Sequence, residues 1–167
     1  AKLVIASNVR DLVAEIERRA SDRQVVVLAS GDPLFFGIGS PLGAKLGPRR
    51  VRVLPHVGAV QLAFARIATA WHDATVLSAH GRPLESIIRQ ALDAAKVAIL
   101  TDAVNSPAAI AAALLAAGME DCRAVVCERL GGPQERSVET SLRGLHGRTF
   151  DVLNVLLLSL IHISEPT

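Results

Sequence analysis

The chain has 167 residues, of which 50% are hydrophobic, 20% charged and 3% aromatic, and its formal net charge is +2. This length is enough for one ordinary core or for two small lobes. The basic residues are scattered and tyrosine is absent, so we expect neither a charged nucleic-acid surface nor a stacking platform for single strands. No apolar run approaches the ~20 residues that a membrane helix needs, and we therefore expect a soluble, cytoplasmic protein without a membrane partner.

The two ends of the chain depart from the pattern between them. The chain opens on AKLVIA, which is almost directly a strand, and it closes on IHISEPT, which continues no earlier pattern. We expect an N-terminally truncated chain in which residues 161–167 are a non-native tail.

Strand and helix signals alternate between these ends. Apolar runs predict strands at 3–6, 24–29, 51–54, 74–81, 97–100, 124–128, 137–139 and 152–158. Apolar residues at helical spacing predict helices after a cap at Ser7 or Asn8, and at 37–46, 60–69, 84–94 and 107–118. Repeated β–turn–α units predict an α/β fold with a largely parallel sheet. In such sheets ligands bind beyond the carboxyl ends of the strands, so the turns at these ends are candidate binding elements.

The first such turn reads ASGDPLFFGIGS and follows the apolar run VVVL. Gly31 allows a close backbone approach and Pro33 fixes the turn. Asp32 carries a carboxylate to the strand end, where it either meets a ligand or caps the helix that follows. Phe35 and Phe36 are expected in the core, although one ring is suited to form an apolar wall beside a ligand.

The turn PHVGA likewise follows a predicted strand, and it carries the small residues Gly58 and Ala59 before the next predicted helix. Small side chains let a planar ligand lie against the backbone, and they equally suit the tight packing of a helix on a strand. Both interpretations stay open at this point.

Two more turns follow predicted strands. In TDAVNSP, Asn105 or Ser106 is expected to cap the helix that begins at Pro107, whereas Thr101 and Asp102 precede the cap and lack that explanation. In SAHGRP the arginine is a candidate for bidentate recognition of a carboxylate. The histidine is either a general base or, as is more common for a lone histidine, a structural residue.

Other kinds of site are not expected. Histidine, cysteine and acidic residues do not occur at metal-ligand spacing, so we expect no metal. Cys122 and Cys127 point to opposite faces of a predicted strand, which favours two buried thiols. The chain has no P-loop, nucleophile elbow or G-x-G-x-x-G motif, so a bound nucleoside would lack phosphates or keep them out of reach.

Taken together, these turns resemble those of the tetrapyrrole (corrin/porphyrin) methylase family. The resemblance rests, in chain order, on ASGDPLFFGIG, VLPHVGAVQLAFARI, SAHGR, TDAVNSPAAIAAALLAAG and CERLGGPQE. Within the family the chain looks most like the group that methylates precorrin-6Y or cobalt-precorrin-7 in cobalamin synthesis. The resemblance covers about residues 1–158.

The resemblance implies a two-lobed fold: an N-terminal lobe with a mostly parallel sheet at 1–70, and a mixed-sheet lobe at 71–160. It also implies S-adenosylmethionine in a cleft between the lobes, a precorrin substrate and a homodimer. The residues implied to contact the cofactor are Ser30, Gly31, Asp32, Phe35, Gly58, Ala59, Thr101, Asp102 and Leu130. His80 and Arg82 are implied to face the tetrapyrrole.

The chain departs from the family pattern in three places. His56 stands where the family usually has glycine, and Gly58 stands where a hydroxyl residue is usual. The Gly- and Pro-rich turn that opens the family, together with its first strand, is not in this sequence.

The implied activity is a C-methyl transfer in which the protein mainly aligns and desolvates its reactants, which explains the lack of an obvious acid–base dyad. No residue is assigned as catalytic, and His80 is a candidate for proton transfer. The alternatives are a catalytically inactive fragment that binds cofactor or tetrapyrrole, and a methylase of this fold with another substrate.

Overall fold

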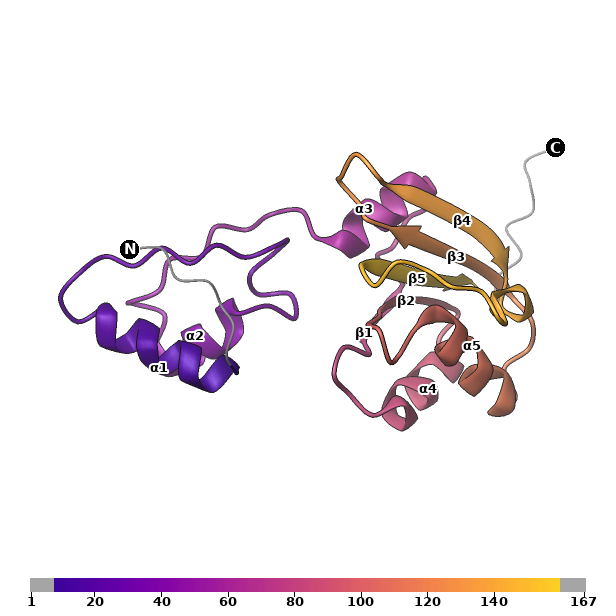
Figure 1. Cartoon of the computed structure of the whole chain (residues 1–167), viewed down its shortest axis with the longest axis horizontal. Helices are drawn as coiled ribbons and strands as arrows, with labels where there is room; N and C mark the ends of the chain where they lie inside the picture. The colour runs from indigo at the N-terminus through magenta and orange to yellow at the C-terminus, as the bar shows by residue number, and fades with distance from the viewer. Residues whose placement is uncertain (1–7, 160–167) are drawn as a thin grey trace. The chain divides into compact units, whose positions relative to one another are not determined.

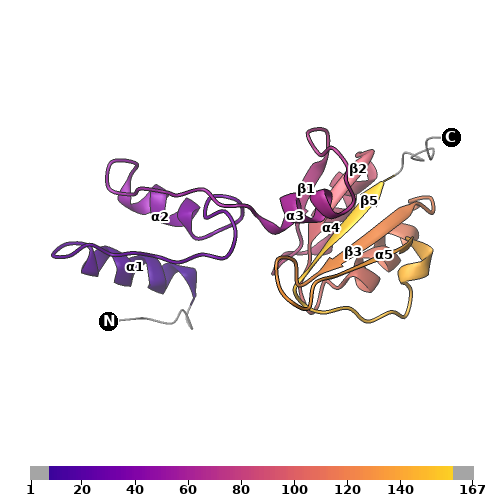
Figure 2. The same cartoon turned by 90° about the horizontal axis from the view of Figure 1, so that it is seen from above.

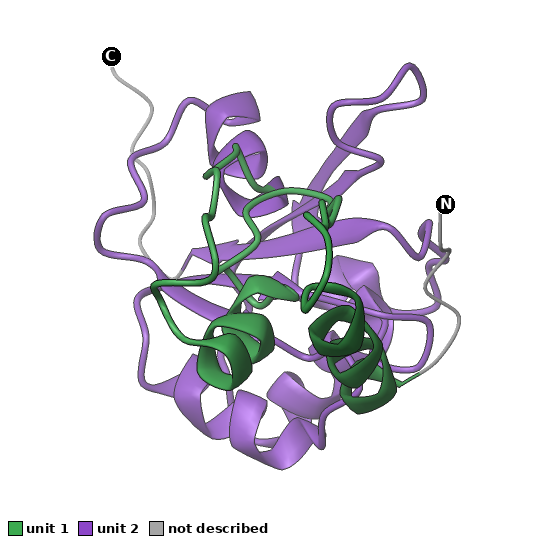
Figure 3. Cartoon of the chain, turned by 90° about the vertical axis from the view of Figure 1, so that its left-hand side faces the viewer, with its two compact units in different colours: residues 1–58 green, residues 59–167 purple. Residues whose placement is uncertain are grey.

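The computed structural model describes residues 8–159, so the strand predicted at 3–6, Ser7 and the tail at 161–167 lie outside the described residues. Figures 1 and 2 show the chain in two views. The elements are α1 (Val9–Arg19), α2 (Gly39–Leu46), α3 (Ala59–Arg66), β1 (Thr75–Ser78), α4 (Leu84–Leu92), β2 (Lys96–Leu100), α5 (Pro107–Ala116), β3 (Arg123–Glu128), β4 (Arg136–Ser141), the 3-10 helix η1 (Arg143–Leu145) and β5 (Asn154–Ser159). They divide into two compact units, unit 1 at residues 1–58 and unit 2 at residues 59–167 (Figure 3).

Unit 1 is built on the pair of helices α1 and α2, which lie side by side (Figures 1 and 2). Asn8 caps α1, since its side chain accepts a hydrogen bond from Asp11 N at 3.0 Å. The apolar faces of the two helices form a small core of Leu12, Val13, Ile16 and Leu42.

The strands predicted at 24–29 and 51–54 are not present, and residues 8–58 contain no strand. Val25 and Val27 pack on the helices, whereas Val26 and Leu28 are 76% and 83% exposed. The run VVVL is thus covered on one face only, although a continuous apolar run is typical of a strand that is buried on both faces. Partly buried and exposed side chains alternate along this extended segment, because one of its sides lies against the helices. A β-strand also needs a neighbouring strand with which it forms hydrogen bonds. Neither segment has one among the described residues, so the parallel N-terminal sheet is not confirmed.

Unit 2 contains a five-stranded mixed sheet with the order β1-β2-β5-β3-β4. β1 and β2 are parallel, β5 runs antiparallel between β2 and β3, and β4 is an antiparallel edge strand. The mixed sheet predicted for the C-terminal part of the chain is confirmed, as is the edge strand near 137–139.

Helices cover both faces of this sheet (Figure 1). α4, α5 and η1 lie on one face, where Val97 and Leu156 are buried. α3 lies on the other face, over Val125 and Leu157. The central strands are therefore buried on both sides, which explains their nearly continuous apolar sequences.

The two cysteines confirm this geometry. Cys122 belongs to the cluster under α4 and α5, and Cys127 belongs to the cluster under α3. Both are buried and free, as predicted, and burial raises the pKa of each thiol.

The predicted helices of unit 2 are all present, with ends that differ by a few residues. α5 begins at Pro107, and Ser106 is its cap because the hydroxyl accepts a hydrogen bond from Ala109 N at 3.3 Å. Within residues 8–159, no helix has both the length and the apolar character required to cross a membrane.

Candidate functional site

The turn that carries Asp32 is closed by hydrogen bonds within itself. Asp32 Oδ1 accepts a hydrogen bond from Leu34 N at 2.8 Å, and Phe35 N donates to the Asp32 carbonyl at 3.2 Å. Asp32 does not cap α2, because the cap position is Ile38 and no side chain bonds there. Among residues 8–159 the second carboxylate oxygen, Oδ2, has no hydrogen-bond partner. It is an acceptor that a ligand can use.

Two glycine turns of unit 1 approach each other closely. Gly31 has φ +72°, and a Cβ built on it would lie 3.4 Å from Gly58 Cα. The structure thus brings Ser30, Gly31 and Asp32 beside Gly58, although the two turns are separate in the sequence. Because neither glycine carries a side chain, the two turns meet backbone to backbone.

The remainder of the first turn depends on two further glycines. Gly39 N donates to the Pro33 carbonyl at 2.8 Å, which closes the loop between them. A Cβ on Gly37 would lie 2.6 Å from Pro33 O, and a Cβ on Gly39 would lie 2.7 Å from the same atom. Any larger residue at either position would force this loop open.

The core position expected for Phe35 and Phe36 is wrong. The rings are 42% and 47% exposed and meet edge to face, with centroids 4.9 Å apart. Both residues lie inside the loop that Gly39 closes onto Pro33, and Phe36 has φ +54°, so the rings turn away from the core of unit 1. An exposed aromatic pair beside Asp32 is suited to pack on an apolar ligand surface.

In unit 2, two of the predicted contacts lie at one edge of the sheet. β2 and β3 both run antiparallel to β5, so they point in the same direction and their carboxyl ends share an edge. Thr101 follows β2 directly, and Leu130 follows β3 and packs partly buried on the cluster under α3. We call this the carboxyl edge.

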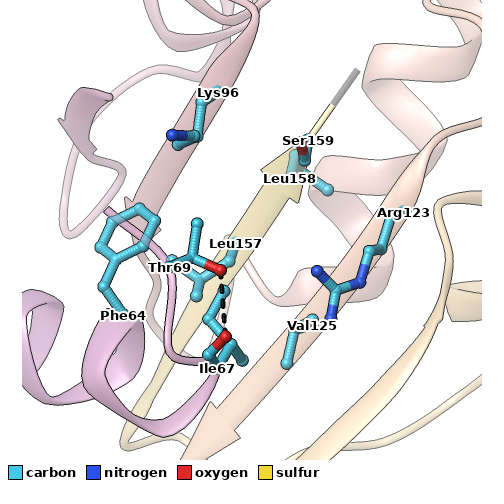
Figure 4. A pocket seen from close by; sticks show the side chains of 9 residues that line it. All are labelled: Phe64, Ile67, Thr69, Lys96, Arg123, Val125, Leu157, Leu158 and Ser159. Atoms are coloured by element: carbon cyan, nitrogen blue, oxygen red, sulfur yellow. Dashed lines mark hydrogen bonds between the residues drawn. The ribbon is translucent and has the colours of Figure 1, made fainter. Parts of the chain in front are cut away.

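The opposite edge of the sheet holds a small cavity (Figure 4). Phe64 and Ile67, near the end of α3, line it together with Lys96 and Arg123, the first residues of β2 and β3. Its volume is about 20 Å³, about the room of one water molecule, and it cannot hold an adenosyl group.

Thr101 uses its side chain inside the protein. The buried Thr101 hydroxyl donates to Asn154 Oδ1 at 2.8 Å, and Asn154 Nδ2 donates to the Asp151 carbonyl at 2.6 Å. These bonds tie the end of β2 to the loop that precedes β5. The backbone of Thr101, and not its hydroxyl, is therefore the part suited to contact a ligand.

The Asp102 carboxylate is almost completely occupied by backbone donors. Gly81 N donates to Oδ2 at 2.7 Å, while Val104 N and Asn105 N donate to Oδ1 at 2.8 and 2.6 Å. These bonds, that of Gly81 first, lower the pKa of the Asp102 carboxyl below its ordinary value. Asp102 therefore joins the turn after β1 to the turn after β2.

Asn105 makes the same connection from the other side. Its buried side-chain Nδ2 donates to the carbonyls of Ala79 and Arg82, at 2.6 and 3.0 Å. His80 and Arg82 are exposed on the turn that is held in this way. This role of Asn105 was not predicted from the sequence. The one hint in the sequence is that Asn105 and Ser106 both precede Pro107, although a helix needs only one capping side chain.

The loop after β3 is held by an ion pair with α3. Arg66 forms a double hydrogen bond with the Glu135 carboxylate, and Gly131 N donates to Glu135 Oε2 at 2.7 Å. Arg66 first, and then the Gly131 N–H, lower the pKa of Glu135 to about 2. This pair fixes the segment that carries Leu130.

The residues that the structure describes contain no group of three or more side chains placed to hold a metal ion. The polar groups of both units instead surround backbone turns, which suits an organic ligand that carries few charges.

The family comparison gives these turns their context. The model of the tetrapyrrole (corrin/porphyrin) methylases matches residues 5–146. The chain belongs to this family. The uroporphyrin-III C-methyltransferase of Thermus thermophilus, solved in complex with S-adenosylhomocysteine, has the same fold with a TM-score of 0.69 and 22% identity, over 90% of this chain and 72% of that one.

Two curated relatives are more similar to this chain in sequence than the Thermus enzyme is. The decarboxylating precorrin-6Y C(5,15)-methyltransferase of Sinorhizobium sp is 40% identical over 127 residues, which are 76% of this chain and 30% of that enzyme. The cobalt-precorrin-7 C(5)-methyltransferase of Salmonella typhimurium is 37% identical over 135 residues, which are 81% of this chain and 66% of that enzyme. The chain thus spans less than a third of the first relative and about two thirds of the second.

Proposed function

We propose that this chain carries an S-adenosylmethionine-dependent C-methyltransferase activity on a precorrin, either precorrin-6Y/6B or cobalt-precorrin-7. The observation that carries the proposal is the paired glycine turn of unit 1, where Gly31 meets Gly58 beside the unused oxygen of Asp32. In a member of this family, that arrangement places two glycines in contact beside one anionic acceptor, without a phosphate cradle. Both named relatives methylate precorrins, which supports the substrate class.

Nine residues are proposed to contact S-adenosylmethionine. They are Ser30, Gly31, Asp32, Phe35 and Gly58 of unit 1, and Ala59, Thr101, Asp102 and Leu130 of unit 2. Asp32 Oδ2 suits a hydroxyl or ammonium donor, and the exposed Phe35 ring suits an apolar surface. Thr101 and Asp102 contribute through their backbone, since both side chains already have partners within unit 2.

The substrate side of the site is proposed to be the turn that carries His80 and Arg82. A precorrin bears acetate and propionate groups, and an exposed arginine is suited to bind a carboxylate with two parallel hydrogen bonds. Both residues are exposed on a turn that buried side chains hold from behind.

In the proposed mechanism the protein mainly aligns the cofactor with the substrate. S-adenosylmethionine supplies, when bound, a methyl group on a sulfonium, which is already a good leaving centre. The turns of the chain orient the two reactants and exclude water, a contribution that can reach effective molarities of about 10⁵ M or more. His80 is a candidate in these turns for accepting a proton.

Further aspects of the proposal concern the whole protein. We propose two lobes, at 1–70 and 71–160. We also propose a homodimer located in the cytoplasm, where the reducing environment keeps free thiols such as these two buried cysteines reduced.

Calorimetric titration with S-adenosylhomocysteine tests the cofactor assignment. The variant Gly31→Ala adds a methyl group 3.4 Å from Gly58 Cα, at the contact of the two turns, and should weaken binding by about 10-fold or more. The matched control is Gly47→Ala, which has a similar φ of +82° at the end of α2 but open space around the Cβ. Equal affinity of the two variants would refute the role of the glycine pair.

A kinetic comparison tests the substrate side. Arg82→Ala should raise the KM for the tetrapyrrole more than the KM for S-adenosylmethionine, and equal effects on both would refute the assignment. If the unmodified protein binds S-adenosylhomocysteine but transfers no methyl group, the chain is a binding module and not an enzyme.

A further inference from the structure

We propose that Asp102 and Asn105 are positioning residues for the substrate, which hold the turn bearing His80 and Arg82, and that neither side chain binds the cofactor. This inference rests on the proposed function, in which Arg82 binds a carboxylate of the substrate. It changes the assignment of Asp102, whose place at a strand end first suggested a cofactor contact.

The first observation is how Asp102 uses its oxygens. A carboxylate offers about four acceptor positions, and three are taken by the N–H groups of Gly81, Val104 and Asn105. Two of these donors belong to the residue's own turn, and the third lies 21 positions away in the turn after β1. A ligand that took over the carboxylate would have to break this connection, so the group is suited to hold the turns together.

The second observation is that Asn105 uses both of its side-chain hydrogens. They reach the carbonyls of Ala79 and Arg82, which are the two ends of the turn. Ala79 N in turn donates to the Leu100 carbonyl at 2.8 Å, which extends the parallel pairing of β1 and β2. The turn is therefore fixed at both ends by Asn105 and in the middle by Asp102.

The third observation is the conformation of Gly81. Its φ is +63°, and no atom lies within 4 Å of the place where a Cβ would stand. Space does not require a glycine there, so the left-handed backbone does. That backbone aims the Gly81 N–H at Asp102, with the exposed His80 and Arg82 on either side of it.

A turn fixed at three points loses little conformational entropy when a ligand binds to its side chains. The ordering of a free arginine on a mobile loop would reduce affinity, whereas here the backbone is ordered in advance. The side chains of Asp102 and Asn105 thus act on the substrate through Arg82 and His80, without touching it.

The decisive experiment compares two neighbouring residues of one loop. Asn105→Ala removes both bonds to the turn and should raise the KM for the precorrin by about 10-fold, with the affinity for S-adenosylhomocysteine held to within about twofold. Ser106→Ala removes the cap of α5 and should lower the melting temperature without changing either constant. The difference between these two variants separates positioning from general stability.

A second pair keeps the test valid if Asn105→Ala fails to fold. Gly81→Ala strains the turn itself, and Gly118→Ala applies a similar strain, at φ +94° and in open space, beyond the end of α5. Gly81→Ala should reproduce the rise in the precorrin KM, and Gly118→Ala should not. The inference is overturned if affinity for S-adenosylhomocysteine falls as much as affinity for the precorrin, or if neither changes.

Failure of the proposed function is distinguished from failure of this inference by the activity of the unmodified protein. An unmodified protein that transfers no methyl group to a precorrin removes both the function and the inference. An active unmodified protein whose turn variants keep the normal precorrin KM removes the inference alone.

Discussion

Asp32 and Asp102 each follow an apolar segment and open a turn, yet the structure uses them in opposite ways. Asp32 closes its own turn with one oxygen, and its second oxygen has no partner among the described residues. Asp102 receives three backbone N–H groups and connects two turns. A carboxylate that follows an apolar segment is therefore a candidate ligand contact only where the backbone leaves part of it unused.

The surroundings of the two turns explain the difference. The Asp102 turn stands on a five-stranded sheet, where neighbouring strands bring a second turn within reach of its side chain. The Asp32 turn stands on a segment without a strand partner among residues 8–58, and it is shaped by its own glycines and proline. The variants below separate or sharpen these two roles.

The largest effect is expected when the Asp32 turn cannot close. Gly39→Ala places a Cβ 2.7 Å from the Pro33 carbonyl oxygen, and overpacking of this kind destabilises by about 1–3 kcal/mol. We expect loss of S-adenosylhomocysteine binding together with a lower melting temperature of unit 1. Gly43→Ala is the control, because it lies in the same helix with no atom within 4 Å and should stabilise by about 0.5–1 kcal/mol. Normal binding by Gly39→Ala would show that the turn is dispensable.

The next effect separates the two aspartates directly. Asp32→Asn preserves an acceptor for Leu34 N but removes the charge on the unused oxygen, so affinity for S-adenosylhomocysteine should fall by about 10-fold or more. Asp102→Asn keeps the backbone through which we propose that this residue contacts the cofactor, so it should leave that affinity unchanged to within about twofold. Calorimetry on both variants decides the matter, and equal losses would contradict the division of roles.

A smaller effect is expected at the support of the carboxyl edge. Thr101→Val leaves the buried Asn154 Oδ1 without its donor, which costs about 1–3 kcal/mol of the free energy of unfolding. For a chain of this size the melting temperature should fall by about 2–10 °C. Thr75→Val, on the edge strand β1, loses no hydrogen bond within the described part of the chain and should change little. A Thr101→Val protein as stable as the parent would mean that the hydroxyl is not used in this way.

The smallest effect concerns the loop that carries Leu130, and it depends on pH. The folded pKa of Glu135 is about 2, below its ordinary 4.5, so ionised Glu135 stabilises the fold above about pH 4.5, and this contribution is lost as the pH falls toward 2. Glu135→Gln should therefore lose less stability than the parent between about pH 5 and pH 2.5, as measured by urea unfolding. Arg66→Gln removes the main cause of the shift and should flatten the same slope. An unchanged slope in both variants would rule out the pair as its source.

The elements of unit 2 were largely predictable because their signals are local. Continuous apolar runs marked strands buried on two faces, and Pro107 marked the first turn of α5. The opposite orientations of Cys122 and Cys127 followed from strand geometry alone.

The features that could not be predicted from the sequence depend on contacts between residues that are distant in the chain. The apolar segments at 24–29 and 51–54 report that one face is buried, and nothing local reports whether a strand pairs beside them. The same limit applies to the site. A motif can place Asp102 at the end of a strand, but only the fold shows that Gly81 occupies its carboxylate.

The position of β5 in the sheet has a consequence for how the protein is made. Among the described strands it is the last to leave the ribosome, yet it lies between β2 and β3 and pairs with both. Until Asn154–Ser159 has emerged, the β1–β2 pair and the β3–β4 hairpin are separate halves with open edges, which favours aggregation. Completion of unit 2 therefore waits for its final described strand, and a nascent chain that is released before this strand should be a substrate for chaperones.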